Sequence, residues 1–146
     1  MTAYLDTSAL AKWYVAEPES ERFEVWLSET ADAVISRLTI VEMRCLLARR
    51  RRSGALTSAL ESRAYGRFME QLAAGQFRLL PMTDSLLGDA LSLIERLPSV
   101  PLRTLDALHL AAARLAAATI VATADLVMRE ATTALGLKVE FFGPIA

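Results

Sequence analysis

Short apolar runs alternate with longer amphipathic stretches along the whole chain. The apolar runs predict β-strands at residues 3–5, 33–36, 77–80, 120–123 and 138–142. Between them, apolar residues recur every three or four positions, which predicts helices over residues 7–15, 19–28, 38–52, 55–74, 84–97, 105–118 and 126–135. Strands that alternate with helices in this way form a parallel sheet with helices on both faces.

Glycine and capping residues mark where these elements end. Gly54, Gly75 and Gly136 follow three of the helices, where glycine is a favoured C-terminal cap. Thr104 is predicted to cap the N-terminus of the last helix but one. The pattern contains no repeat, linker or low-complexity segment. It therefore predicts one α/β domain over residues 1–146, with three layers and a central, mostly parallel sheet of about five strands.

The composition is that of a folded domain. Hydrophobic residues make up 53% of the 146 residues, which is enough for a sizeable core, and the net charge of −1 is no global sign of nucleic-acid binding. The single cysteine, Cys45, cannot form an internal disulfide and fits a reducing compartment. The N-terminus lacks the pattern of a signal peptide, and the most apolar stretch, residues 105–118, is too short and too charged to span a bilayer. We therefore expect a cytoplasmic protein without a membrane segment.

Three carboxylates are predicted to lie at one edge of the sheet. Asp6 directly follows the first strand, and Asp125 lies two residues after Thr123, where a later strand ends. Asp106 lies in the first turn of the helix that Thr104 is predicted to cap. Ligands of open α/β sheets bind beyond the carboxyl ends of the strands, so this edge is a candidate site.

A fourth acid, Glu42, lies in an apolar stripe of its helix. Its neighbours at helical spacing are Leu38, Val41, Cys45 and Leu46. A lone carboxylate in such a stripe is costly unless a cation offsets it. Nothing in the local sequence neutralises the four acids, so we expect them to converge on one shared cation.

Each acid also has a purely structural interpretation, and these remain open. Asp6 and Asp125 are suited to cap the helices that follow them, and Asp106 in a first turn is favoured by the helix dipole. Glu42 could pair with Arg44 or Arg103. The position of three acids on one predicted sheet edge favours a common site.

An all-oxygen cluster of this kind suits a hard cation such as Mg²⁺ or Mn²⁺. Such an ion can activate water and neutralise the charge that develops on a phosphodiester. The hydroxyls of Ser8, Thr104 and Thr123 lie one or two residues from the acids and could orient them, although capping and turn roles explain these residues equally well. The sequence thus predicts a metal-dependent hydrolase of phosphate esters.

The segments that contain the acids resemble PIN-domain proteins. They are residues 4–10 (YLDTSAL), 39–44 (TIVEMR), 102–111 (LRTLDALHLA) and 121–125 (VATAD). The third segment is the most specific, the order is that of the family, and the resemblance spans essentially the whole chain. In length and in the third segment the chain is most similar to VapC-type toxins of toxin–antitoxin pairs. Leu126 and Met128 depart from many relatives, which carry a basic residue soon after Asp125.

The resemblance implies a metal-dependent endoribonuclease that cleaves RNA phosphodiester bonds with Mg²⁺ or Mn²⁺. It implies that the catalytic and metal-binding residues are Asp6, Glu42, Asp106 and Asp125, and that the hydroxyls of Ser8, Thr104 and Thr123 orient these carboxylates or a metal-bound water. It also implies a cognate VapB-like antitoxin and a homodimer. The alternative is a PIN-domain RNA-processing nuclease, or a non-catalytic PIN module that binds RNA or protein, outside a toxin–antitoxin pair.

Two rival activities fit the residues less well. A haloacid-dehalogenase-type phosphatase needs a second Asp two residues after the first, where this chain has Ser8. A phospho-acceptor receiver domain needs an acidic pair near the first strand, but Leu5 precedes Asp6. Three interpretations of the arginine run 49–52 remain open: a solvated helix end, a contact to RNA phosphates, or a contact to a partner protein. His109 is expected to be a packed structural histidine.

Overall fold

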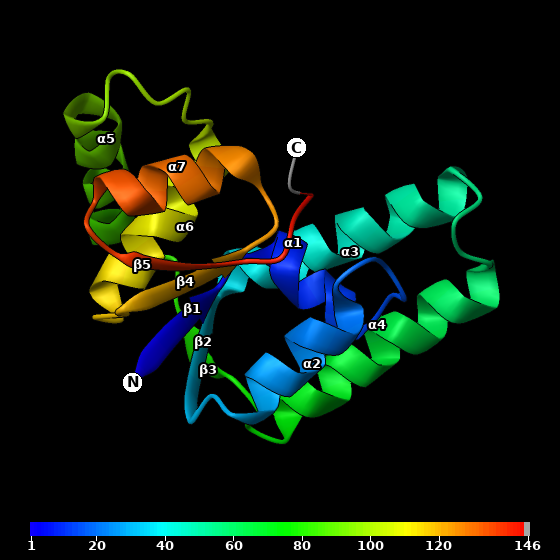
Figure 1. Cartoon of the computed structure of the whole chain (residues 1–146). Coiled ribbons are helices and arrows are strands. Elements are labelled where there is room, and N and C mark those ends of the chain that lie inside the picture. Colours follow the sequence, from blue (N-terminus) through cyan, green and yellow to red (C-terminus); the bar gives the residue numbers. More distant parts are fainter. Residues whose placement is uncertain (145–146) are drawn as a thin grey trace.

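A five-stranded sheet forms the middle layer of the molecule (Figure 1). The structure, a computed structural model, describes residues 1–144. The strands are β1 (Thr2–Leu5), β2 (Asp32–Ser36), β3 (Arg78–Leu80), β4 (Ile120–Thr123) and β5 (Lys138–Phe141). They pair in the order β3-β2-β1-β4-β5, and every neighbouring pair is parallel. The predicted α/β class and five-stranded sheet are confirmed. The predicted extent of 1–146 stays a prediction, because residues 145 and 146 lie outside the described part.

Helices connect the strands and return the chain to the same end of the sheet each time. They are α1 (Thr7–Leu10), the 3₁₀-helix η1 (Ala11–Trp13), α2 (Ser20–Ser28), α3 (Arg37–Arg52), α4 (Ser58–Ala73), α5 (Asp84–Arg96), α6 (Thr104–Leu115) and α7 (Leu126–Ala134). Because all strands are parallel, their carboxyl ends share one edge. Among residues 1–144, none of the helices is long and apolar enough to cross a membrane.

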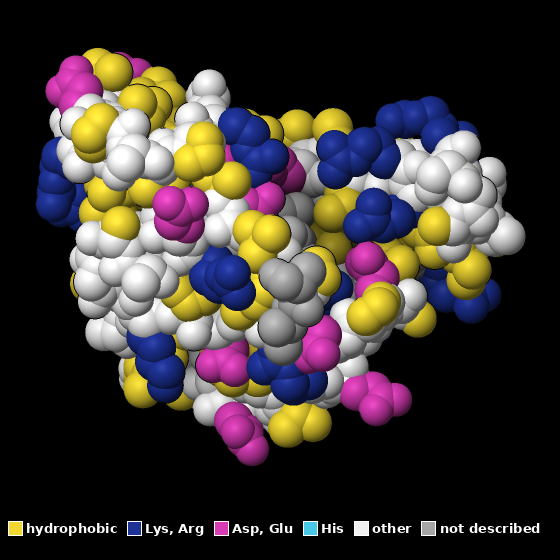
Figure 2. Space-filling model, turned by 45° about the horizontal axis from the view of Figure 1, so that its top comes forward, with side chains coloured by type: hydrophobic (Ala, Val, Ile, Leu, Met, Phe, Trp, Pro, Cys, Tyr) yellow, Lys and Arg dark blue, Asp and Glu magenta, His cyan; other side chains and the backbone are white. Residues whose placement is uncertain are grey.

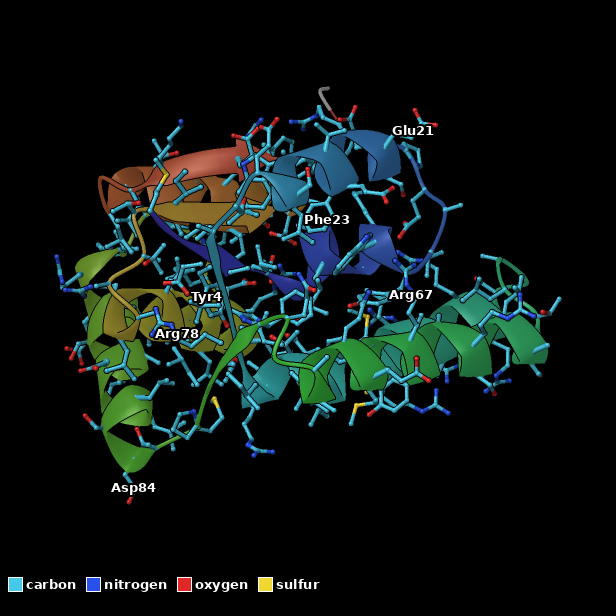
Figure 3. All side chains as sticks on the ribbon, turned by 90° about the horizontal axis from the view of Figure 1, so that it is seen from below. Tyr4, Glu21, Phe23, Arg67, Arg78 and Asp84 are labelled. Carbon is cyan, nitrogen blue, oxygen red and sulfur yellow. The ribbon has the colours of Figure 1, made fainter. Side chains whose placement is uncertain are left out.

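The two faces of the sheet carry separate hydrophobic clusters. Neighbouring strand residues point to opposite faces, so Tyr4 packs in the cluster beneath α5, α6 and α7, and Leu5 packs in the cluster with α1 to α4. Figure 3 shows Tyr4 on the α6 side of the sheet and Phe23 on the α2 side. Both faces are covered, which confirms the predicted three layers and explains why the strands read as continuous apolar runs.

Helices α3 and α4 lie side by side and extend beyond the sheet as an arm (Figure 1). Gly54, in a left-handed conformation with φ of 84°, ends α3, and the amide of Ala55 bonds back to the carbonyl of Arg50. Glu61 of α4 is buried against α3 and accepts from Arg51 at 2.9 Å. These contacts hold α3 and α4 together at the end of the arm.

Both ends of the helix predicted over residues 105–118 differ from those of α6, each for a physical reason. Arg103, not Thr104, is the N-cap of α6, because the Asp106 carboxylate accepts the backbone N–H of Arg103. The same helix stops at Leu115, since Ala117 has a left-handed φ of 54°. The apolar pattern continues to Ala118 only because that residue is buried as well.

Candidate active site

A cavity of about 650 Å³ opens at the carboxyl edge of the sheet. It is lined by the four acids that the sequence singled out: Asp6, Glu42, Asp106 and Asp125. Asp6 follows β1, Glu42 lies in the second turn of α3, Asp106 lies in the first turn of α6, and Asp125 lies between β4 and α7. Two of the acids directly follow strands, and the other two lie near the N-termini of helices. In a parallel sheet, these positions all lie at the edge formed by the carboxyl ends of the strands.

Asp6 is one of the two buried carboxylates of the site, with 6% of the residue exposed, the same fraction as Asp106. Its backbone N–H donates to Ala122 at 2.9 Å, which extends the β1–β4 ladder and fixes the residue. One carboxylate oxygen accepts from Ser8 at 2.9 Å and from Thr123 at 2.7 Å. Asp6 is the N-cap of α1 by position, yet its side chain makes no capping bond. Burial raises the pKa of Asp6 above its usual value, although nearby His109 and the two hydroxyls oppose this.

A chain of hydrogen bonds joins Glu42 to the sheet through His109. The Tyr4 hydroxyl donates to Ser36 at 3.1 Å and lies 2.7 Å from Nδ1 of His109, so Nδ1 carries a proton and donates to Tyr4. The other ring nitrogen, Nε2, is bonded to a Glu42 oxygen. A carboxylate accepts only, so Nε2 donates too. His109 with both nitrogens protonated is a cation, and the Thr7 hydroxyl donates to the same Glu42 oxygen at 2.8 Å.

Charge and burial act against each other at this pair. Burial lowers the pKa of His109, but its Tyr4 contact, its hydrogen bond to Glu42 and the charge of Asp6, 3.6 Å away, outweigh burial and raise the pKa well above its usual value. Burial raises the pKa of Glu42, but the bond from His109 and the bond from Thr7 outweigh it and lower the pKa. His109 thus places one positive charge beside Asp6 and Glu42 and offsets part of their negative charge.

Arg103 has the equivalent role for the other two acids. Its guanidinium donates to both carboxylate oxygens of Asp106, at 2.8 and 3.2 Å, and to Asp125 at 2.8 Å. Asp125 also caps α7 by accepting the N–H of Met128 at 3.0 Å, so its predicted capping role is real and leaves its second oxygen for Arg103. Burial raises the pKa of Asp125, and the Met128 amide together with Arg103 outweighs burial and lowers it.

The expectation that nothing local neutralises the acids is therefore wrong. Glu42 pairs with His109 rather than with Arg44 or Arg103, and Arg103 pairs with Asp106 and Asp125. Within residues 1–144, no three His, Cys, Asp or Glu side chains are arranged closely enough to hold a metal ion. The donor set is nevertheless of the right kind, since carboxylate and hydroxyl oxygens are what Mg²⁺ and Mn²⁺ prefer.

The apolar stripe around Glu42 lines the cavity, and Leu46 of this stripe is also part of the hydrophobic core. Val41 is 62% exposed and Cys45 is exposed, and both line the cavity with Leu38 and Leu46. Helical spacing correctly placed these residues on one face of α3. It did not reveal that this face borders an open cavity, which lets Glu42 stay partly hydrated.

The predicted hydroxyl residues divide into two groups. Ser8 and Thr123 both bond to Asp6, as described above, and Thr123 also accepts the N–H of Asp125 at 3.0 Å. Thr104 lines the cavity but, among the described residues, its hydroxyl has no hydrogen bond to any of the four acids. Thr7 and Arg103 were not predicted as site residues, although both lie in segments that resemble the family, next to Asp6 and Thr104.

The arginine run at the end of α3 serves more than one purpose. Arg50 pairs with Glu17 at 3.2 Å and so joins the arm to the segment before α2, whereas Arg51 pairs with Glu61 and joins the two helices of the arm. Arg49 instead lines the cavity. Figure 2 shows basic side chains along the arm beside the acidic side chains in the middle of the face.

Comparison with known proteins finds a matching family model, a relative in sequence and solved structures of similar fold. The chain matches the family model of the PIN domain over residues 3–133. Ribonuclease VapC47 of Mycobacterium tuberculosis is 35% identical over 114 residues, which cover 75% of this chain and 73% of the relative. A chain in the structure of FitAB bound to an IR36 DNA fragment has a TM-score of 0.74 and 22% identity, over 99% of this chain and 98% of its own. M. tuberculosis VapC20, a toxin that cleaves the sarcin–ricin loop, has a TM-score of 0.69 and 18% identity, over 93% and 96%. The two structures, being less than 25% identical, show a shared fold.

Proposed function

The chain belongs to the PIN domain family, and on that premise we propose that it is a metal-dependent endoribonuclease, the toxin of a type II toxin–antitoxin pair. The observation that carries the proposal is the gathering of four carboxylates around one cavity, one of them the nearly buried Asp6. The similarity to ribonuclease VapC47 supports RNA as the substrate. We propose Asp6, Glu42, Asp106 and Asp125 as catalytic and metal-binding residues.

The chain's own residues would prepare the site for Mg²⁺ or Mn²⁺. A bound divalent ion supplies an activated water and neutralises charge that develops on the phosphodiester. Ser8 and Thr123 hold the Asp6 carboxylate in one orientation through one of its oxygens. Thr7 and His109 hold Glu42 in the same way. Arg49 lies on the cavity wall, where it can contact an RNA phosphate.

The test is RNA cleavage by purified protein with Mg²⁺ or Mn²⁺. Asp6→Asn and Asp106→Asn should each lower cleavage by at least ~100-fold, because charge neutralisation by a metal is worth several kcal/mol. Asp32→Asn is the matched control, since Asp32 pairs with Arg78 at 3.0 Å and lies at the amino end of β2, away from the cavity. Undiminished cleavage in EDTA, or in the Asp6→Asn Asp106→Asn double variant, would falsify this mechanism.

One observation favours the alternative of a PIN module that binds RNA or protein without cleaving it. In the structure, His109 and Arg103 already pair with all four acids, as two separate halves. RNA binding that is insensitive to EDTA, together with an absence of cleavage in Mg²⁺ and in Mn²⁺, would establish that alternative.

The proposed partner is a cognate VapB-like antitoxin in the cytoplasm. An acidic cavity with an apolar wall of Leu38, Val41 and Leu46 suits a peptide that carries a basic residue beside apolar ones. Expression of this protein alone should slow growth, and co-expression with the small protein encoded beside it should restore growth. If the partner's basic residue nearest the cavity is replaced and inhibition is unchanged, the partner acts by covering the apolar wall.

We also propose a homodimer. Helix α5 exposes Leu87, Leu91 and Ile94 at helical spacing, so one of its faces is apolar and open. Light scattering at micromolar concentration should report about twice the chain mass of 16.0 kDa. A monomer at every concentration tested would remove this proposal.

A further inference from the structure

The guanidinium of Arg103 lies between two acids that the proposed function assigns to metal binding. It engages both oxygens of Asp106 and one oxygen of Asp125. We propose that Arg103 is a built-in counter-ion of the site, which holds these two acids as a pair and competes with a divalent cation for their oxygens. The inference rests on the proposed metal binding and assigns this arginine a role of its own.

Of the three side chains in this ion-pair group, that of Arg103 is the one that can move away. Its side chain is 63% exposed, whereas that of Asp106 is 9% exposed and that of Asp125 is 30% exposed. Because the guanidinium is the best hydrated of the three groups, it can turn into solvent at a lower cost than either carboxylate can. The buried carboxylate has no such freedom.

The two carboxylates do not need the guanidinium to keep their positions. Asp106 also accepts the backbone N–H of Arg103 at 3.0 Å, as part of the cap of α6. Asp125 accepts the backbone N–H of Met128 at 3.0 Å. Loss of the Arg103 side chain therefore leaves both acids oriented by main-chain donors and exposes oxygens that a cation can take.

The four acids are divided between two cationic side chains, and Arg103 is the cation of the Asp106–Asp125 half. Within the described residues no three potential ligands are close enough to hold a metal, and the guanidinium occupies three of the four oxygens of the Asp106–Asp125 pair. A divalent ion carries twice the charge of the guanidinium and binds carboxylates without a fixed fork geometry. The structure thus describes a site whose metal affinity is lowered by its own arginine.

The experiment measures Mn²⁺ binding by isothermal titration calorimetry, without RNA. Arg103→Ala should bind Mn²⁺ at least ~10-fold more tightly than the unchanged protein, because a unit positive charge next to the ion is removed. Arg103→Gln, which is neutral but retains much of the side chain, should change the affinity in the same direction if the alanine variant does not fold. Arg78→Ala is the matched control, since Arg78 makes two hydrogen bonds to Asp32 far from the cavity, and its Mn²⁺ affinity should be unchanged.

Thermal unfolding provides a second measurement that does not depend on catalysis. Mn²⁺ should raise the Tm of Arg103→Ala more than it raises the Tm of the unchanged protein. Equal or weaker Mn²⁺ binding by folded Arg103→Ala or Arg103→Gln, or binding by none of the proteins, overturns the inference. If the variants bind Mn²⁺ more tightly but no protein cleaves RNA, the role of Arg103 as counter-ion is supported and only the proposed nuclease activity is refuted.

Discussion

His109 and Glu42 are hydrogen-bonded to each other across the cavity, although 67 residues separate them in the sequence. The imidazole is 2% exposed and touches Tyr4 on its other side. A buried cation that faces two carboxylates stabilises the site only while it keeps its proton. This relationship makes the stability of the protein depend on pH.

His109→Gln should lower the free energy of unfolding by about 2 kcal/mol at pH 6, because a charged, buried hydrogen bond is lost. The folded-state pKa of His109 is raised, so its contribution is complete below its ordinary value of 6.5 and is lost as pH rises through the raised value. The pKa of Glu42 is lowered, so its contribution is present above 4.5 and is lost as pH falls through the lowered value. Urea unfolding from pH 4 to 10 should show the two proteins converge at alkaline pH. A constant difference up to pH 10 would mean that the pKa of His109 is the same in the folded and the unfolded protein, which contradicts this prediction.

Asp6→Asn should raise the Tm of the protein in EDTA by roughly 2–4 °C, the shift that about 1 kcal/mol produces in a domain of this size. The reason is that burial raises the pKa of Asp6, so the ionised form is unfavourable at neutral pH. The asparagine can still accept from Ser8 and Thr123. Differential scanning calorimetry measures the change, and a lower Tm would show that His109 more than compensates for burial.

Thr123→Val should lower RNA cleavage about 10–100-fold and destabilise the fold by about 1–3 kcal/mol. The variant keeps the shape of the side chain but removes the donor to Asp6 and the acceptor for the Asp125 amide. Thr132→Val is the matched control, because the buried Thr132 hydroxyl has no hydrogen-bond partner among the described residues. Equal activity of both variants would show that Asp6 needs no hydroxyl to orient it.

Arg49→Ala should raise the KM for RNA about 3- to 10-fold and leave kcat nearly unchanged, as expected for a contact to a substrate phosphate. The slope of log affinity against log salt should fall by about 0.7, the value for one phosphate contact to a single strand. Arg50→Ala is the control, since Arg50 pairs with Glu17 and does not line the cavity. The interpretation fails if Arg50→Ala raises KM as much as Arg49→Ala does.

Ala117→Gly should stabilise the protein by about 0.5–1 kcal/mol without an effect on cleavage. Ala117 ends α6 with a φ of 54°, a conformation that costs about 1–2 kcal/mol for alanine and that glycine adopts freely. The gain is partly offset by the greater freedom of glycine in the unfolded chain. Chemical denaturation measures the difference, and a loss of stability would mean that the alanine methyl packs favourably.

Much of the site could be predicted from the sequence, because the positions of the acids relative to strands and helices follow from local residue patterns. Apolar runs of strand length, separated by helical periodicity, are sufficient to predict a parallel sheet. Asp6 and Asp125 follow strands directly, and a parallel sheet places every such position at one edge. The placement of the acids around one cavity thus follows from chain position, and their chemical roles remain to be tested.

Only the tertiary structure decided which cations face these acids. Arg103 reaches Asp125 across 22 residues, and His109 reaches Glu42 across a different pair of helices, through side-chain orientations that packing sets. Helical periodicity likewise showed that Val41 and Leu46 share a face with Glu42, but periodicity carries no information on what lies opposite a face. Contacts between segments far apart in the sequence determine which cation pairs with each carboxylate. They also determine whether an apolar helix face becomes core or cavity wall.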